Sequence, residues 1–483
     1  MNIKILKNSI KIILFFTLLV VLLIGANKIL MVKENNGGTI SIRNFYNNNM
    51  DNVDVLFLGT SHTYTAINPA VLWEKQGITS YNLGTSAQPI ITSYYQLKQA
   101  LTISSPKVVV LDVFGTTDYI DDLKLKEEYL NINYSAMPLS QNKVELAKKQ
   151  LLGDLTQKDT LDYILGYPIY HSKYAAGQLK TIDFYGEMVD SERFYKVDKN
   201  DKGFFSNVNT TPITLPKMDI TETSELLIDD EEYLKLIVEL CNENNIKLVF
   251  MIAPYQASKN EIKRFNSVKL FAEENDIKFI NFFEKNIVNE ETDFADTGHL
   301  NIYGAEKISV YMARFLKNNF KDIQNRKGEE NTESYDELLN YYTHQMLALE
   351  IKKSDMSFLE VLDEYPENYI VVFSANGNYR SAILYQYFKE QIEPYGFTYK
   401  SINTNNIYMC EDDTYITVKN DHKGFEWVKD ITQKEPLSIA RKIGDKTPTI
   451  YLSDKAYYLM NDKISIFIYD KFFETYIDTK IIY

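Results

Sequence analysis

The stretch V-D-V-L-F-L-G-T-S-H-T-Y-T-A-I-N-P, from Val53 to Pro69, is the segment that decides the fold. Its first part, 53–58, is an apolar run rich in residues that favour strands, and the run stops at Gly59. Small polar residues follow before the apolar pattern resumes near Trp73, which predicts a buried strand, a tight turn and a helix. Open parallel sheets bind ligands at the carboxyl ends of their strands, beside helix N-termini. Ser61 in this turn is therefore placed like a nucleophile, and the alternative is a serine that only caps the helix.

A serine hydroxyl needs a base and an orienting acid before it is an effective nucleophile. Both occur far downstream in F-A-D-T-G-H-L-N-I-Y-G-A-E-K-I, from Phe294 to Ile308. Asp296 and His299 are three positions apart in this segment, so one turn can present both side chains to a single site. The alternatives are a surface histidine and an aspartate that caps the next helix. The order favours a serine, histidine and aspartate relay.

The combined motifs resemble the SGNH (GDSL-like) hydrolase superfamily, which has Ser in a G-x-S turn, a later Gly in N-L-G, and a final D-x-x-H before L-N-x-x-G. The nearest layout is the membrane-anchored branch that transfers acyl groups on surface polymers, similar to the teichoic acid D-alanyl transfer protein. The resemblance covers roughly residues 54–320. It implies a three-layer α/β/α fold with a parallel sheet and no cofactor. It also implies Ser61 as nucleophile, His299 as general base and Asp296 as its partner.

The same resemblance implies an oxyanion hole that contains the backbone N–H groups of Ser61 and Gly84. The G-x-N-D block of the family, whose Asn donates to the oxyanion, is not evident here. The third predicted strand ends in V-V-V-L-D-V-F-G, over 108–115, which puts Asp112 where an amide would be useful. A carboxylate stabilises an oxyanion only when it is protonated. His62 is a further candidate donor beside the nucleophile, and a packing role is its alternative.

Strand-like and helix-like segments alternate along the first half of the chain. Strands are expected at 53–58, 80–83, 107–113, 247–252 and 278–282, and helices at 71–77, 94–101, 231–242, 262–275 and 305–320. This alternation predicts βαβ units and a parallel sheet. Residues 116–223 do not show this alternation, apart from a helical segment at 144–152. We expect them to form an insertion that overhangs the site as a lid or substrate platform.

The N-terminus carries an apolar run from Ile12 to Val32, long enough for a bilayer core, which needs about 20 residues. Lys4, Lys7 and Lys11 precede it and predict a cytoplasmic N-terminus with the bulk of the chain outside. A cleaved signal peptide ending near Ala26 is the alternative. The expected organisation is a tip and transmembrane anchor over 1–33, a stalk over 34–52, an SGNH-like domain over 53–320, a polar linker over 321–336 and a smaller α+β domain over 337–483.

The C-terminal region, over roughly 356–483, resembles the domain of the interleukin-like EMT inducer proteins. The likeness lies in Y-I-V-V-F-S-A-N-G-N-Y, from Tyr369, and in I-S-I-F-I-Y-D, from Ile464. It implies a compact α+β module without an evident catalytic set. Helices are expected at 337–351 and 382–392, and strands at 369–373, 415–418, 449–452 and 464–469.

The composition argues against several other classes of protein. The net charge of −14 and the lack of a basic stripe argue against nucleic acid as partner. The two cysteines, Cys241 and Cys410, fall in different predicted domains and indicate no disulfide framework. His171, His344 and His422 are isolated, so no metal site is expected.

The sequence therefore predicts an extracytoplasmic serine esterase or O-acyltransferase held at the cell membrane. Its expected substrate is an acylated carbohydrate or another cell-surface polymer such as teichoic acid, with a membrane-bound acyl donor protein as a possible partner. The alternative is a non-catalytic surface binding or assembly protein that retains the fold. Hydrolysis and acyl transfer share one acyl-enzyme, so the sequence does not separate them.

Overall fold

The structure is a computed structural model of the 483-residue chain. It describes residues 3–30, 37–48, 50, 52–151, 157–166, 201–353, 358–376, 407–411, 414–418, 424–431, 436–443, 445, 447–452, 455–459 and 463–482. The chain divides into two compact units, 1–339 and 340–483.

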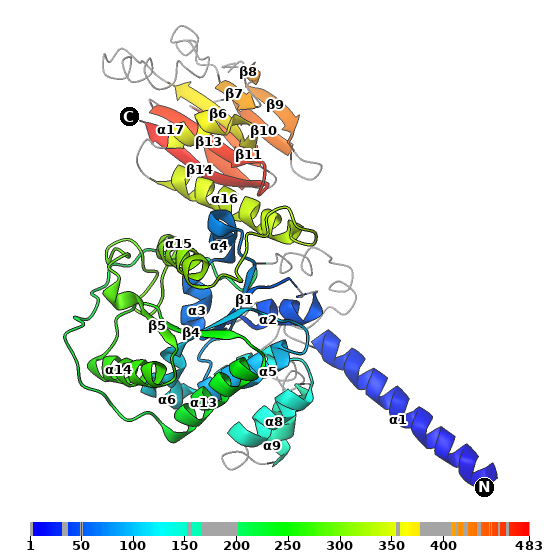
Figure 1. The fold of residues 1–483 in the computed structure, drawn as a ribbon. Helices are drawn as coiled ribbons and strands as arrows, with labels where there is room; N and C mark the ends of the chain where they lie inside the picture. Colours follow the sequence, from blue (N-terminus) through cyan, green and yellow to red (C-terminus); the bar gives the residue numbers. More distant parts are fainter. Residues whose placement is uncertain are drawn as a thin grey trace. The chain divides into compact units, whose positions relative to one another are not determined.

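The first unit is built on a five-stranded sheet in the order β2-β1-β3-β4-β5 (Figure 1). The strands are β1 (Val55–Gly59), β2 (Ser80–Gly84), β3 (Val108–Asp112), β4 (Lys247–Ile252) and β5 (Lys278–Asn281). All four pairings are parallel, with Val55 opposite both Ser80 and Val108. The chain moves from β1 to one edge and then returns to the other side, so the order reverses between β1 and β3. Ligands of such sheets bind at this reversal, outside the carboxyl ends of the strands. The predicted parallel α/β sheet is confirmed.

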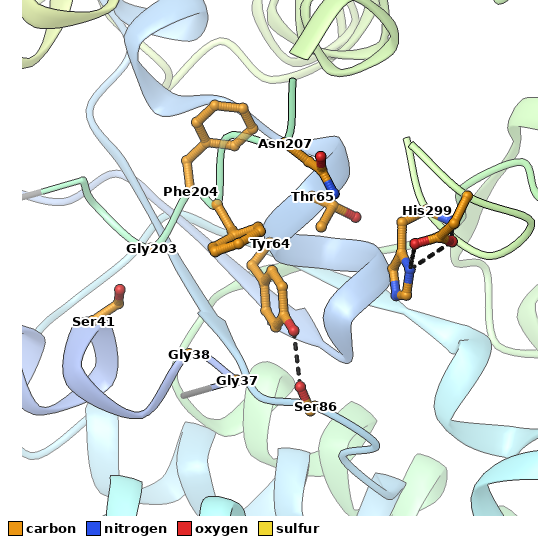
Figure 2. A pocket seen from close by; sticks show the side chains of 12 residues that line it. Gly37, Gly38, Ser41, Tyr64, Thr65, Ser86, Gly203, Phe204, Asn207 and His299 are labelled. Atoms are coloured by element: carbon orange, nitrogen blue, oxygen red, sulfur yellow. Dashed lines mark hydrogen bonds and ion pairs between the residues drawn. The ribbon is translucent and has the colours of Figure 1, made fainter. Parts of the chain in front are cut away.

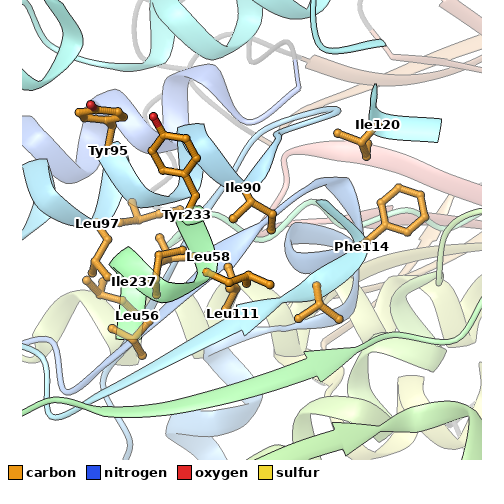
Figure 3. Close-up of a cluster of buried hydrophobic side chains, with 14 of the residues drawn as sticks. Leu56, Leu58, Ile90, Tyr95, Leu97, Leu111, Phe114, Ile120, Tyr233 and Ile237 are labelled. Carbon is orange, nitrogen blue, oxygen red and sulfur yellow. The ribbon is translucent and has the colours of Figure 1, made fainter. Parts of the chain in front are cut away.

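Alternate residues of each strand enter two separate hydrophobic cores, because successive side chains point to opposite faces of a sheet. Leu56 and Leu58 of β1 belong to the first core, and Val55 and Phe57 belong to the second. Figure 3 shows part of the first core, where Leu97 and Ile237 from two helices meet strand residues. Its helices include α2 (Thr39–Asn47), α5 (Ile90–Ala100), α13 (Ile228–Glu243) and α14 (Lys259–Glu274), and those of the second core include α3 (Ser61–Ala66), α4 (Pro69–Gln76) and α15 (Ile302–Asn319). The sheet therefore lies between two helical layers.

The segment predicted as a stalk, 34–52, is part of this fold where it is described. Ile42 and Phe45 of α2 are fully buried and belong to the first core. Tyr81 of β2 donates its hydroxyl to the carbonyl of Ser41 at 2.6 Å. Polar runs flank α2 on both sides, so the sequence suggested a stalk. Ile42 and Phe45 are spaced by three positions, which is enough to form one buried face of a helix. The domain therefore begins before Val53.

The segment predicted as a linker, 321–336, also packs against the first unit. Arg326 forms two hydrogen bonds with the carboxylate of Asp54, at 2.7 and 2.8 Å, and Asp54 is 2% exposed. Tyr335 is 2% exposed and lies beside Trp73, with ring centroids 5.4 Å apart. A buried carboxylate requires a paired cation, and this arginine supplies one from a polar stretch. Polar composition therefore misidentified a docked segment as a spacer.

The predicted insertion contains α6 (Asp118–Leu123), α7 (Glu127–Ala136), α8 (Gln141–Gln150) and α9 (Gln157–Leu165) in its described part. Helix α8 overlaps most of the helix expected at 144–152. The chain is described again from 201, and Phe205 then donates its backbone N–H to the carbonyl of Tyr64 in α3 at 2.8 Å. The insertion thus leaves the sheet at the carboxyl end of β3 and passes the Ser61 turn again at Phe205, 18 residues before its predicted end. Its role as a lid or substrate platform stays a prediction.

The second unit begins within α16 (Glu333–Lys352) and continues through α17 (Phe358–Glu364) into antiparallel sheets. One sheet has the order β14-β13-β6-β7-β8 and the other β12-β11-β10-β9. In chain order these strands are β6 (Tyr369–Asn376), β7 (Ile407–Glu411), β8 (Thr414–Val418), β9 (Phe425–Asp430), β10 (Pro436–Arg441), β11 (Thr449–Leu452), β12 (Lys455–Tyr458), β13 (Lys463–Asp470) and β14 (Thr475–Ile482). Buried residues of both sheets, such as Val372 and Ile439, form one core. The helix expected at 382–392 lies outside the described residues.

The N-terminal helix α1 (Ile3–Leu30) covers most of the predicted anchor. Its apolar side chains are exposed where they are described, with Ile13 and Phe15 both at 63%. In the part of the chain that the structure describes, no helix combines the length and the apolar character needed to cross a membrane. The membrane anchor stays a prediction.

Candidate active site

The nucleophile turn lies at the carboxyl end of the central strand β1. Thr60 caps α3, and its hydroxyl accepts the backbone N–H of His62 at 3.2 Å. Ser61 is thus the first helical residue and not the cap, which removes the alternative interpretation of this serine. Gly59 has a φ of 145°, and a Cβ there would lie 2.4 Å from Thr63 Oγ1. The sharp turn therefore requires glycine, because other residues rarely adopt this backbone conformation.

His299 joins Ser61 to Asp296 across the site. Its Nε2 lies 2.9 Å from Ser61 Oγ, and its Nδ1 lies 3.0 and 3.1 Å from the two carboxylate oxygens of Asp296. Two consecutive hydrogen bonds therefore connect Ser61 to Asp296, and the first of them joins residues that are 238 positions apart in the sequence. This is the order and geometry that a serine nucleophile, a histidine base and an orienting carboxylate require.

Local hydrogen bonds hold the Asp296 carboxylate in place. Its Oδ1 accepts the backbone N–H groups of Gly298, at 2.7 Å, and His299, at 2.9 Å. The side chain of Asp296 is 54% exposed and that of His299 is 32% exposed. Asn301, not Asp296, caps α15, since its side chain accepts from Tyr303 and Gly304. The carboxylate is therefore free to face the imidazole.

Gly84 lies opposite Gly59 in the β1–β2 ladder. A Cβ at Gly84 would lie 2.7 Å from the Thr60 carbonyl oxygen, so glycine permits the close approach of the nucleophile turn. Thr85 donates its N–H to Gly59, and N–H groups alternate sides along a strand, so the Gly84 N–H points away from β1. Gly84 lines neither cavity of the site. The geometry gives its predicted oxyanion role no support.

Ala87, three residues later, lines the site beside Ser61 and has a φ of 49°, which is uncommon for a residue other than glycine. Among the described residues, its backbone N–H and that of Ser61 have no acceptor. Strained backbone at a site is often functional. Sequence reasoning missed Ala87, although its position after N-L-G-T-S was a usable signal.

Asp112 supports the nucleophile turn from behind. It is fully buried and accepts the Phe114 N–H at 3.3 Å and the hydroxyls of Thr63 and Thr60 at 3.4 and 3.5 Å. Burial raises the pKa of this carboxyl to about 7, against the three hydrogen bonds, which lower it. Asp112 lines neither cavity, so it positions the turn and does not face a bound oxyanion.

His62 packs among aromatic rings beside the triad. It is 4% exposed and stacks on Phe114 with ring centroids 3.8 Å apart, and its ring lies 5.4 Å from that of His299. Burial, followed by the nearby His299, holds the pKa of His62 well below its ordinary value, so the ring is neutral. Its Nδ1 is buried and has no hydrogen-bond partner among the described residues. The packing interpretation explains the ring but leaves this nitrogen unsatisfied.

Two cavities meet at the triad. The aromatic cavity, of about 370 Å³, is lined by Ser61, His62, Tyr64, Ser86, Ala87, Phe114, Tyr119, Ile120, Leu123, Tyr129, Tyr255, Gln256, Glu261, Thr297, Gly298 and His299. The glycine cavity, of about 360 Å³, is lined by Gly37, Gly38, Ser41, Tyr64, Thr65, Ser86, Gly203, Phe204, Phe205, Asn207, Asp296 and His299. Figure 2 shows the glycine cavity, with His299 on one side and the bonded pair Tyr64 and Ser86 near the centre.

No cluster of three potential metal ligands occurs within the described ranges of the chain. Cys241 is buried and carries a free thiol, whose pKa burial raises. His344, in the second unit, stacks on Phe472 with ring centroids 3.9 Å apart. His171 and His422 lie outside the described residues.

Comparisons with known proteins add little to this geometry. No protein-family model matches the chain, and no curated protein sequence matches it significantly. Among solved structures, the chain is similar to a "putative acylhydrolase" from Bacteroides fragilis, with 12% identity, a TM-score of 0.27, and coverage of 57% of this chain and 94% of that chain. At this identity and TM-score the match carries no inference about activity.

Proposed function

We propose that the chain is a serine esterase or O-acyltransferase that uses Ser61, His299 and Asp296. The observation that carries the proposal is the unbroken pair of hydrogen bonds from Ser61 Oγ to His299 Nε2 and from His299 Nδ1 to Asp296. A serine within 2.9 Å of a histidine whose second nitrogen faces a carboxylate is arranged for proton removal during nucleophilic attack.

In the proposed reaction, His299 Nε2 takes the proton of Ser61 while Oγ attacks the carbonyl carbon of an ester. The resulting tetrahedral oxyanion collapses, the C–O bond to the alcohol breaks, and His299 returns its proton to the leaving oxygen. Water or another hydroxyl then attacks the acyl-enzyme with His299 as base, and Ser61 is released. Asp296 stabilises the charged imidazole in both halves.

The oxyanion would be stabilised by backbone N–H groups. We assign this role to Ser61 and Ala87, whose N–H groups lack acceptors among the described residues while both residues line the aromatic cavity. Preorganised donors of this kind are each worth roughly 100-fold to 1000-fold in rate. Asp112 would not contribute, because the Thr60 and Thr63 hydroxyls engage it behind the turn.

We further propose that α1 anchors the chain at a membrane and that its substrate is an acylated polysaccharide or teichoic acid at the cell surface. Support comes from the exposed apolar side chains of α1 and from the lysines that precede the apolar run. A tethered enzyme suits a polymer that is assembled at the same membrane. A membrane-bound protein would then supply the acyl group.

A fluorophosphonate probe tests the reaction class on the full chain in detergent. We expect the probe to label the wild type and not Ser61→Ala, and His299→Ala to label at least 1000-fold more slowly because the base is lost. Ser140→Ala is the control, because Ser140 lines neither cavity and its hydroxyl accepts the backbone N–H of Lys143 at the start of α8. It should label like the wild type.

Turnover of p-nitrophenyl acetate by the same variants completes the test. A wild type that neither turns over this ester nor reacts with the probe would favour the alternative, a surface binding protein. The observation behind that alternative is the absent third oxyanion donor, since Asp112 occupies its expected place in the sequence.

A further inference from the structure

We propose that the triad separates two binding sites, with the acyl group of the substrate in the aromatic cavity and the alcohol in the glycine cavity. This inference depends on the proposed acyl-serine chemistry and assigns its two substrate classes. The alcohol is a sugar or another polyol. One such alcohol leaves when Ser61 is acylated, and a second accepts the acyl group afterwards, so the enzyme transfers acyl groups between hydroxyls.

The aromatic cavity has the lining that an acyl chain requires. Phe114, Ile120 and Leu123 supply apolar surface, and Tyr119, Tyr129 and Tyr255 add aromatic surface. Its volume of about 370 Å³ exceeds what an acetyl group needs, since one water molecule occupies about 30 Å³ of liquid. Burial of each CH₂ group of a longer chain would gain about 0.8 kcal/mol.

His62 adds ring surface to this cavity, while its Nδ1 is buried away from it. Its ring is 4% exposed, it belongs to the cavity lining, and its Nδ1 has no partner in the described part of the chain. Unpaired buried nitrogen is costly unless a water or a ligand satisfies it. Because this nitrogen has almost no accessible surface, only the ring face of His62 contributes to the cavity wall.

The glycine cavity has a different chemistry. Gly37, Gly38 and Gly203 contribute backbone to the lining, and the Ser41, Thr65 and Ser86 hydroxyls together with the Asn207 side chain add polar groups. Ser41 and Thr65 already donate to Asp201 and to the Ser61 carbonyl, so their hydroxyl oxygens are available to a ligand as acceptors. Phe204 and Phe205 add a flat apolar surface. A sugar combines hydroxyl edges with an apolar face, so this mixture of groups suits it better than it suits an acyl chain.

The division between the cavities coincides with the reacting atoms. Tyr64 Oη and Ser86 Oγ lie 2.8 Å apart, and these residues and His299 are shared by both linings (Figure 2). Ser61 belongs only to the aromatic side and Asp296 only to the glycine side. An acyl group on Ser61 would therefore extend into the aromatic cavity, while His299 would remain within reach of a hydroxyl in the glycine cavity.

Deacylation by an acceptor then balances without any further reagent. The acceptor hydroxyl gives its proton to His299 Nε2, and its oxygen forms a bond to the acyl carbon. The bond from that carbon to Ser61 Oγ breaks, and Oγ takes the proton back from His299. Leaving alcohol and acceptor use the same cavity, because deacylation is the reverse of acylation.

Two exposed aromatic residues offer a matched pair of variants. Tyr119 is 55% exposed and lines only the aromatic cavity, and Phe205 is 49% exposed and lines only the glycine cavity. Truncation of either to alanine removes a cavity wall with little effect on the core. The assay uses the full chain with p-nitrophenyl esters from acetate to octanoate, and methyl glucoside as acceptor.

Tyr119→Ala should change the ratio of kcat/KM for octanoate and acetate by about 10-fold and leave the ratio of transfer to hydrolysis unchanged. Phe205→Ala should lower the transfer ratio by about 10-fold and leave the acyl preference unchanged. The assignment is overturned if each variant alters both ratios equally, if the effects are exchanged, or if the wild type hydrolyses esters but never acylates the acceptor. A wild type without any ester turnover would instead overturn the proposed function itself.

Discussion

The two sides of the triad are built differently. On the nucleophile side, Thr60, Thr63 and Asp112 are fully buried around the turn that carries Ser61. On the base side, Asp296 is 54% exposed and His299 is 32% exposed. Ser61 Oγ and His299 Nε2 nevertheless lie 2.9 Å apart.

This difference shows that two different sets of contacts hold the Ser61 turn and the Asp296 carboxylate in position. The central strands β1 and β3 fix the nucleophile turn through contacts that also hold the core together. Backbone N–H groups of the same short loop fix the Asp296 carboxylate. Changes at the nucleophile turn should therefore affect folding and rate together, whereas changes at the base loop should affect rate alone.

The same substitution on both sides gives the strongest contrast. A Cβ at Gly59 would lie 2.4 Å from Thr63 Oγ1 and 2.7 Å from Asp112 Cβ, at a φ of 145°. Strain and overpacking together should lower the free energy of unfolding of Gly59→Ala by about 5 kcal/mol. Denaturant unfolding of the full chain measures this loss.

Gly298→Ala is the matched control. Its added Cβ would meet only Asp296 Oδ1, at 3.4 Å, which is ordinary contact, and its φ is not positive. We expect a change within about 0.5 kcal/mol. Equal destabilisation by the two variants would mean that the base loop is as constrained as the turn, and the comparison would fail.

The buried Asp112 predicts a pH dependence that belongs to the nucleophile side. Burial raises its pKa to about 7 in the folded protein, so the folded state holds a proton that the unfolded chain releases near its ordinary value of 3.8. Stability falls with pH wherever the folded state binds more protons, so this group destabilises the fold progressively between about pH 4 and pH 7. Each pKa unit corresponds to about 1.4 kcal/mol, which gives up to about 4 kcal/mol in total.

Asp112→Asn removes that titration. The free energy of unfolding of the variant should therefore improve relative to the wild type as pH rises from 4 to 8, by up to about 4 kcal/mol. Urea unfolding of both proteins at each pH measures the difference. Parallel curves for the two proteins would show that the carboxyl titrates normally in the fold.

The sheet and the triad could be predicted from sequence because both depend on local patterns. Apolar runs that end at Gly59 and Asp112 identified strands, and D-T-G-H before a helix identified Asp296 and His299. The role of Asp112 depended on hydroxyls about 50 residues away, which no local pattern reveals. The prediction of a stalk over 34–52 was wrong for a similar reason. Phe45 is buried against the sheet, and that contact cannot be seen in the local sequence.

Other site residues required the tertiary structure. Ser86 and Ala87 line the cavities, yet neither belongs to a motif that the sequence highlighted. Tyr64 lies within the 53–69 stretch, but no pattern in that stretch distinguished it as a site residue. Arg326 and its partner Asp54 are 272 positions apart. The polar stretch 321–336 therefore resembled a linker in the sequence, because the ion pair cannot be predicted from that stretch alone. Sequence patterns predicted the helices and strands and where they end. Contacts between those helices and strands determine which side chains line the site.

Among the variants of the proposed triad, the smallest expected effect is at Asp296. A triad carboxylate that is buried commonly contributes about 10⁴-fold to the rate, since nothing else can stabilise the charged imidazole. At 54% exposure, water can replace part of the carboxylate in Asp296→Ala and accept the Nδ1 proton of His299. We therefore expect kcat to fall by about 100-fold, or about 2.7 kcal/mol, far less than in Ser61→Ala, with unfolding unchanged. Steady-state turnover of p-nitrophenyl acetate measures the loss, and a decrease as large as that of Ser61→Ala would mean that the loop is shielded from water during catalysis.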